Sequence, residues 1–153
     1  MLLCIIVGGL VAIGNPCQSW VVLSRSFTQR SVMIPQGPTL QTGKQSDYLE
    51  RHNLIADVTA LLIRTARAIN IHYMLEQPLS SLLNHYSPIV RATHDAISTS
   101  FEMSAFGGDS PKPLLVRHNC PWMRVAAPTT TQTTNKTKSK NNQPRSSGRC
   151  SST

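Results

Sequence analysis

The sequence predicts an α/β fold with a mostly parallel sheet, one long helix and a disordered C-terminal tail. Three observations predict it: an apolar run that stops at a Gly-Asn-Pro turn, a long segment of helical periodicity, and several short strand-like runs after that segment. Strands that alternate with helices are typical of a parallel sheet. The length of 153 residues suits one domain with its own core. We place this domain at residues 1–127 and the tail at residues 128–153.

The first predicted strand is the apolar run Leu10–Gly14, which stops at Asn15-Pro16. Short apolar runs bounded by turn residues are typical of buried strands. We expect Ser19–Leu23 to extend from this strand. Proline and glycine recur between Ser24 and Gly43 without a sustained period, so this stretch is predicted to be a loop.

The long helix is predicted over Ser46–Asn70. Ser46 can cap its start, and arginines near its end suit the negative pole of the helix dipole. Apolar residues at spacings of one, three and four form a stripe that we expect to face the core. The stripe consists of Leu54, Ile55, Val58, Leu61, Leu62, Ala66 and Ile69.

Shorter elements are predicted after the long helix. Pro78 and Pro88 mark the boundaries between them, since proline cannot continue a strand ladder and suits the first turn of a helix. The predicted elements are a strand Ile71–Leu75, a helical turn Leu79–Asn84, a short helix Pro88–Thr93, and strands Thr99–Ala105 and Leu114–Val116.

The net charge of +8 lies mostly in the tail. From Thr129 onward there is no acidic residue and no Leu, Ile, Val or aromatic residue. Such a segment cannot bury enough apolar surface to offset the entropy of ordering, so it is predicted to be disordered. Its cations could bind DNA weakly by counterion release, or the tail is only a solvated end. They are Lys136, Lys138, Lys140, Arg145 and Arg149.

The four cysteines and five histidines show no metal-binding pattern. No two cysteines have C-x-x-C spacing, and the histidines are scattered. We therefore expect no metal, reduced thiols and an intracellular protein. The apolar run at residues 2–13 is too short to span a bilayer. Its alternative interpretation is the leader of a secreted protein, although no basic residue precedes Arg25.

A thiol and a carboxylate follow two of the predicted strands. Cys17 comes just after the first strand, and Glu76 just after the strand that follows the long helix. A crossover through one helix makes such strands neighbours, so we expect both side chains to face one crevice. A thiolate beside an acid that can protonate a ring nitrogen suits covalent activation of a pyrimidine.

Two motifs at these positions resemble cytosine-5 DNA methyltransferases. Pro16-Cys17-Gln18 resembles the Pro-Cys-Gln nucleophile motif, and Glu76-Gln77-Pro78 resembles the Glu-Asn-Val element of that family. Phe106-Gly107 followed by Lys112 resembles its later Tyr-Gly and Gln-x-Arg-x-Arg segment. Residues 11–122 are also similar to uncharacterised methyltransferase-like proteins of unicellular algae.

The resemblance implies a role for each matching residue. Cys17 would attack the cytosine at carbon six, and Glu76 would bind its ring nitrogen. Pro16 and Gln18 would contact the substrate, and Lys112 would stand where an arginine usually supports the site.

The resemblance also implies a partial Rossmann-like fold of the class I methyltransferase type, with S-adenosylmethionine as the cofactor. The Gly-rich loop that binds this cofactor normally precedes the cysteine by several elements, and only sixteen residues precede Cys17. The cofactor-binding residues are therefore unknown, and we expect the catalytic half of such a domain, inactive alone. Two alternatives stay open: a non-catalytic nucleic-acid or protein interaction module, and a small secreted protein with a cleaved leader.

Overall fold

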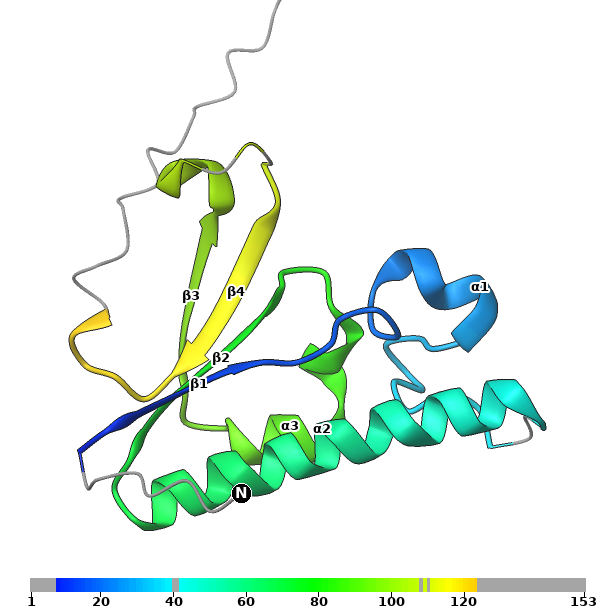
Figure 1. Ribbon diagram of the computed structural model, residues 1–153, viewed down its shortest axis with the longest axis horizontal. Helices are drawn as coiled ribbons and strands as arrows, with labels where there is room; N and C mark the ends of the chain where they lie inside the picture. Colours follow the sequence, from blue (N-terminus) through cyan, green and yellow to red (C-terminus); the bar gives the residue numbers. More distant parts are fainter. Residues whose placement is uncertain (1–7, 40–41, 108, 110, 124–153) are drawn as a thin grey trace, which may run out of the picture.

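The computed structural model describes residues 8–39, 42–107, 109 and 111–123, which form a mixed α/β fold around one four-stranded sheet (Figure 1). The predicted α/β class and the single long helix are confirmed. The tail from residue 128 onward lies outside the described residues. In chain order the elements are β1 (Leu10–Gly14), η1 (Val22–Ser24), α1 (Arg25–Thr28), α2 (Lys44–Ala68), β2 (His72–Pro78), η2 (Leu82–His85), α3 (Ser87–Ala92), β3 (Ile97–Glu102), η3 (Met103–Phe106) and β4 (Pro113–His118).

The sheet is mixed, so the prediction of a mostly parallel sheet is wrong. The strand order is β1-β2-β4-β3, with β1 parallel to β2 and β4 antiparallel to both of its neighbours. The connection from Glu102 to Pro113 is short, and such connections join antiparallel neighbours, whereas parallel pairs need a longer crossover. Among strands that lie next to each other in the sheet, only β1 and β2 are joined by such a crossover, which contains α2.

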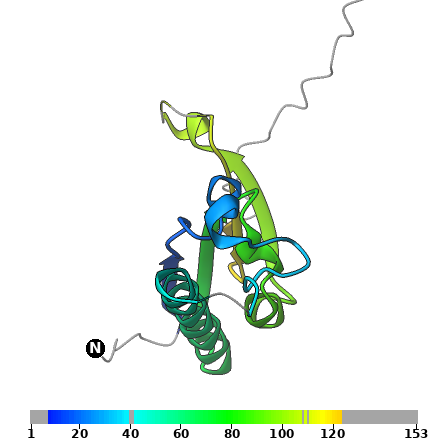
Figure 2. The same cartoon turned by 90° about the vertical axis from the view of Figure 1, so that its right-hand side faces the viewer.

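Helices α2 and α3 lie on the same side of the sheet (Figures 1 and 2). Side chains alternate between the two faces of a strand, so Tyr73, Leu75 and Gln77 of β2 turn toward these helices, where all three are buried. The core between the two layers consists of Trp20, Ala56, Ala60, Ile63, Ala66, Ile71, Tyr73, Leu75, Leu82, Leu83, Tyr86, Ile89 and Ala92.

The segment after β1 differs from its prediction. Ser19–Leu23 does not extend the strand, because the Trp20 N–H donates to the Cys17 carbonyl at 2.9 Å and turns the chain. The predicted loop Ser24–Gly43 contains the short helix α1. By contrast, β1 has the predicted bounds, and α2 begins and ends two residues before the predicted helix.

The face of α2 that packs on the sheet is not the predicted one. Of the predicted stripe, Ala66 is buried, whereas Leu54, Val58, Leu61, Leu62 and Ile69 are exposed. Small and polar side chains take their place in the core, and a pattern based on large apolar residues does not detect them. The buried residues of α2 are Leu49, His52, Ala56, Thr59, Ala60, Ile63 and Ala66.

Candidate functional site at the carboxyl ends of the parallel strands

Residues 15–20, which we call the Cys17 turn, begin where β1 ends, and the core holds this turn in place. Asn15 is buried: its side-chain oxygen accepts a hydrogen bond from Thr59 Oγ1 at 3.1 Å, and its carbonyl accepts one from Gln77 Nε2 at 3.3 Å. The next residue, Pro16, is exposed, Cys17 is half-buried and Gln18 is exposed. The turn therefore places the thiol near the surface, while the buried Asn15 holds the start of the turn in position.

Trp20 anchors the other end of this turn. Its ring is 1% exposed and lies 5.1 Å from the Tyr86 ring. The Arg30 guanidinium lies over it, 3.7 Å from the ring centroid, which is cation–π geometry. The Trp20 carbonyl accepts a hydrogen bond from the Leu82 N–H at 2.8 Å. The turn is thus tied to the segment that follows β2.

Glu76 lies inside β2, and not after that strand as predicted, beside the end of β1. In the parallel register of β1 and β2, Gly14 pairs with Glu76, and the space next to Gly14 holds the carboxylate: a Cβ added there would lie 3.9 Å from Glu76 Oε2. Glu76 is half-exposed on the sheet face away from the helices. Cys17 follows Gly14 by three residues, so both groups belong to the same edge of the sheet. Within the described part of the chain, no hydrogen bond or ion pair joins them.

Lys112 belongs to this edge as well. It directly precedes β4, which runs antiparallel to β2 and pairs Leu114 with Pro78 at the end of that strand. Lys112 is exposed, and its carbonyl accepts a hydrogen bond from the Met103 N–H at 3.3 Å. Gly107, in the same connection, has a φ of 81°, a backbone conformation that favours glycine.

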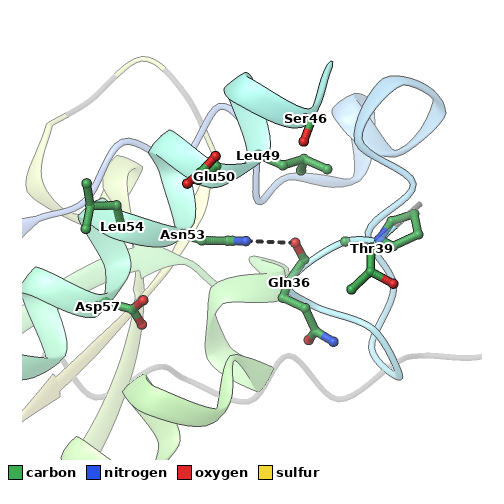
Figure 3. A pocket seen from close by; sticks show the side chains of 10 residues that line it. Gln36, Thr39, Ser46, Leu49, Glu50, Asn53, Leu54 and Asp57 are labelled. Atoms are coloured by element: carbon green, nitrogen blue, oxygen red, sulfur yellow. Dashed lines mark hydrogen bonds between the residues drawn. The ribbon is translucent and has the colours of Figure 1, made fainter. Parts of the chain in front are cut away.

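A second feature lies between α2 and the loop before it (Figure 3). It is a hollow of about 440 Å³, and a hydrogen bond of 3.0 Å from Asn53 Nδ2 on α2 to the Gln36 carbonyl on the loop joins its two walls. Glu50 and Asp57 give it two carboxylates. Gly37, with a φ of 85°, lets the loop approach α2, because a Cβ there would lie 2.8 Å from Leu49 Cδ1. No motif in the sequence marks this hollow.

Arg30, which no sequence motif marks, is buried next to Asn53, one of the residues that line the hollow. Its Nη1 donates to the Pro35 carbonyl and, at 2.9 Å, to Asn53 Oδ1. Burial lowers the pKa of Arg30 to about 10. Among the described residues its Nε and Nη2 have no hydrogen-bond partner, and the guanidinium lies against the Trp20 ring.

Two further hollows lie along α2. One, of about 530 Å³, lies between parts of α2 and α3 and is lined by Arg64 and Arg91 among others. The other, of about 700 Å³, lies at the end of α2 beside the ion pair of Arg67 with Asp95 at 2.5 Å. None of these three hollows is lined by Cys17, Glu76 or Lys112.

Cys120 is the other cysteine in the described residues, and it differs from Cys17. It is fully buried, with its Sγ 3.6 Å from the Tyr73 carbonyl, and this burial raises the pKa of its thiol. A buried thiol with a raised pKa is a poor nucleophile. Neither Cys17 nor Cys120 forms a disulfide.

Comparisons with protein-family models, with curated proteins and with solved structures gave no match to this chain. Within residues 8–39, 42–107, 109 and 111–123, no cluster of His, Cys, Asp or Glu has the arrangement of a metal site. None of the helices described is both long and apolar enough to cross a bilayer.

Proposed function

We propose that this chain is the base-binding half of a methyltransferase-type domain, with Cys17 as the nucleophile and Glu76 as the acid. The observation that carries the proposal is the parallel pairing of Gly14 with Glu76, which brings the Cys17 turn and the carboxylate to one edge of the sheet. Ligands of open α/β sheets bind at that edge. Mixed sheets are common among doubly wound folds, so the antiparallel β4 is compatible with a partial Rossmann-like domain.

The chemistry assigned to these residues is addition to an unpaired cytosine. The Cys17 sulfur loses its proton to water and forms a bond to carbon six, and the electron pair of the ring double bond moves toward carbon five and the conjugated ring nitrogen. Glu76, in its acid form, holds a proton at that nitrogen and neutralises the charge that develops there. The base must leave the DNA stack for the sulfur to reach it. Lys112, Pro16 and Gln18 stand at the same edge, where they can contact the substrate.

In the family that the motifs resemble, S-adenosylmethionine supplies the methyl group. The described residues do not fit this cofactor. A dinucleotide-type site needs a strand, a Gly-rich loop and a helix N-terminus in close succession, and here the helix that follows β1 through the Cys17 turn is α1, which spans only Arg25–Thr28. We therefore assign no methyl-transfer step to this chain.

Adduct formation on a cytosine analogue tests the proposal. In 5-azacytosine, nitrogen replaces carbon five, so the sulfur–carbon bond can form while the double-bond pair moves to nitrogen five and takes a proton from water. The expected result is a denaturant-resistant complex between the full chain and single-stranded DNA containing this base, with the added mass on the Cys17 peptide. Cys17→Ser should abolish it and Glu76→Gln should slow it, whereas Cys150→Ser should not affect it. No adduct, or an adduct that survives Cys17→Ser, would refute the proposed function.

A second candidate is a protein interaction module. The observation that favours it is a set of solvent-exposed large apolar side chains in the segment around α1, where Leu23 is 93% exposed and Met33 is 88% exposed. Exposed apolar groups that gather in one region are typical of binding surfaces. An apolar fluorescent dye should bind the chain, and Leu23→Ser with Met33→Ser should reduce its fluorescence without changing the melting temperature. Unchanged fluorescence would remove this candidate.

A further inference from the structure

The side of α2 that faces away from the sheet carries a row of aliphatic residues. A surface helix normally exposes polar side chains there. Figure 2 shows α2 at the outside of the molecule, with the sheet on its inner side and α3 beside it. We call the exposed row the outer α2 face; its members are Leu54 at 62%, Val58 at 48%, Leu61 at 60%, Leu62 at 48% and Ile69 at 50% exposed.

The spacing of these residues places them on one side of the helix. Leu54, Val58 and Leu61 are four and three residues apart, and the same steps continue through Thr65 to Ala68. Steps of four and three are the pattern by which two helices pack along a common seam. At 1.5 Å per residue, the face from Leu54 to Ile69 is about 22 Å long. The buried residues Ala56, Ala60 and Ile63 occupy the opposite side of α2.

Charged residues along one edge of this face indicate what covers it. Glu50, Asp57 and Arg64 recur every seven residues, so they form a row beside the aliphatic seam. The row is acidic toward the start of α2 and basic toward its end. In an antiparallel pair of identical helices, a two-fold axis brings the same edge of each helix together in reverse order. Asp57 then meets Arg64 of the second copy, and the same pair forms again by symmetry.

A parallel pair would not use these charges. There, the row with Asp57 would face the opposite edge of the other helix, which carries Ile55, Leu62 and Ile69. The carboxylates would then lie against aliphatic side chains of the second copy, and the cations beside Asp57 would be Arg64 and Arg91 of its own copy, which line the same hollow. Asp57 can accept a further hydrogen bond. Its Oδ1 accepts one from the Tyr86 hydroxyl at 3.0 Å, whereas its Oδ2 has no hydrogen-bond partner within the described residues.

We propose that the outer α2 face binds a second copy of this chain as an antiparallel helix pair. Val58 of one copy packs against Leu61 of the other, and Asp57 pairs with Arg64. An interface one helix wide is at the small end of stable interfaces, so the dimer should dissociate on dilution. This proposal rests on the outer α2 face alone and does not depend on the proposed function.

Sedimentation of the full chain over a wide concentration range tests the dimer. The expected result is a monomer–dimer equilibrium that Leu61→Asp abolishes. The matched control is Leu79→Asp, which introduces the same charge at a leucine that is 47% exposed and off this face. It should leave the dimer intact. Circular dichroism melts of both variants show that the fold is retained. A monomer at every concentration, or a dimer that Leu61→Asp does not weaken, would overturn the proposal.

Charge reversal then tests the antiparallel register. Arg64→Asp and Asp57→Arg should each weaken the dimer about tenfold or more, because each places like charges together at two symmetric positions. The double variant should restore the affinity to within about threefold of the original, since the pair re-forms with its signs exchanged. If the double variant is as weak as the single ones, Asp57 and Arg64 do not meet and the antiparallel register is wrong.

Discussion

Removing the Trp20 side chain should destabilise the fold more than any other single truncation near the Cys17 turn. The ring is 1% exposed, packs on Tyr86 at 5.1 Å and lies beneath the Arg30 guanidinium at 3.7 Å. Truncating a buried Trp to Ala costs about 3–5 kcal/mol. The loss of the ring also removes the cation–π partner of Arg30, worth about 2 kcal/mol when desolvated. We therefore expect Trp20→Ala to lower the free energy of unfolding by at least about 4 kcal/mol.

Urea denaturation followed by circular dichroism measures this difference. Trp122→Ala is the matched control, because Trp122 is 52% exposed and its ring meets the His72 ring edge to face, with 4.4 Å between the ring centroids. Its cost should be below about 1 kcal/mol. The milder Trp20→Phe keeps a ring in place and supplies a measurable value if Trp20→Ala does not fold. Equal costs at the two tryptophans would refute the view that Trp20 anchors the turn.

Three further predictions concern the loop, the pH dependence and the tail. Gly37→Ala should lower the free energy of unfolding, measured by urea denaturation, by about 1–3 kcal/mol, because its φ of 85° disfavours a side chain and the new Cβ would lie 2.8 Å from Leu49 Cδ1. An unchanged free energy of unfolding would contradict the described loop. Desolvation, together with the hydrogen bond to Asp57, raises the pKa of Tyr86 to about 12. The folded state therefore holds this proton more tightly than the unfolded state, and stability should fall from about pH 10 to pH 12. Tyr86→Phe should show a smaller fall, and identical pH profiles would contradict the assignment. DNA binding by the full chain should show a slope of log affinity against log salt of about −4.5, for five phosphate contacts made by the tail. A chain that ends at Pro128 should lose most of this binding. Equal binding by both chains would place the DNA site in residues 1–127.

The sequence predicts the elements better than their arrangement. β1 could be predicted because its apolar run ends at Asn15-Pro16, and α2 because helical periodicity persists over many residues. The position of β4 between β2 and β3 could not, because local periodicity carries no information on which strands pair. The turn at Trp20 is predicted as strand because the hydrogen bond from the Trp20 N–H to the Cys17 carbonyl, which turns the chain there, leaves no pattern in the sequence.

The face of α2 shows a second limit of periodicity. A stripe of large aliphatic residues predicts which side of a helix avoids water, but it does not say what covers that side. In this chain the sheet covers Ala56, Ala60 and Ile63, while Leu54 and Leu61 stay exposed. The sequence therefore predicts an apolar side of α2 correctly, but the prediction that this side faces the core is wrong. Arg30 and the hollow beside Asn53 had no sequence signal, since they depend on contacts between distant segments.

The juxtaposition of Cys17 with Glu76 is the central claim, and an intramolecular cross-link tests it most directly. Glu76→Cys places a second thiol at this position, and dibromobimane becomes fluorescent only when it bridges two thiols. With Cys4 and Cys150 replaced by serine, we expect a fluorescent peptide pair that joins Cys17 to position 76. Glu102→Cys, on an exposed residue at the end of β3, is the control and should give no such pair. Equal cross-linking from Glu102→Cys, or none from Glu76→Cys, would show that the thiol and the carboxylate do not share a site.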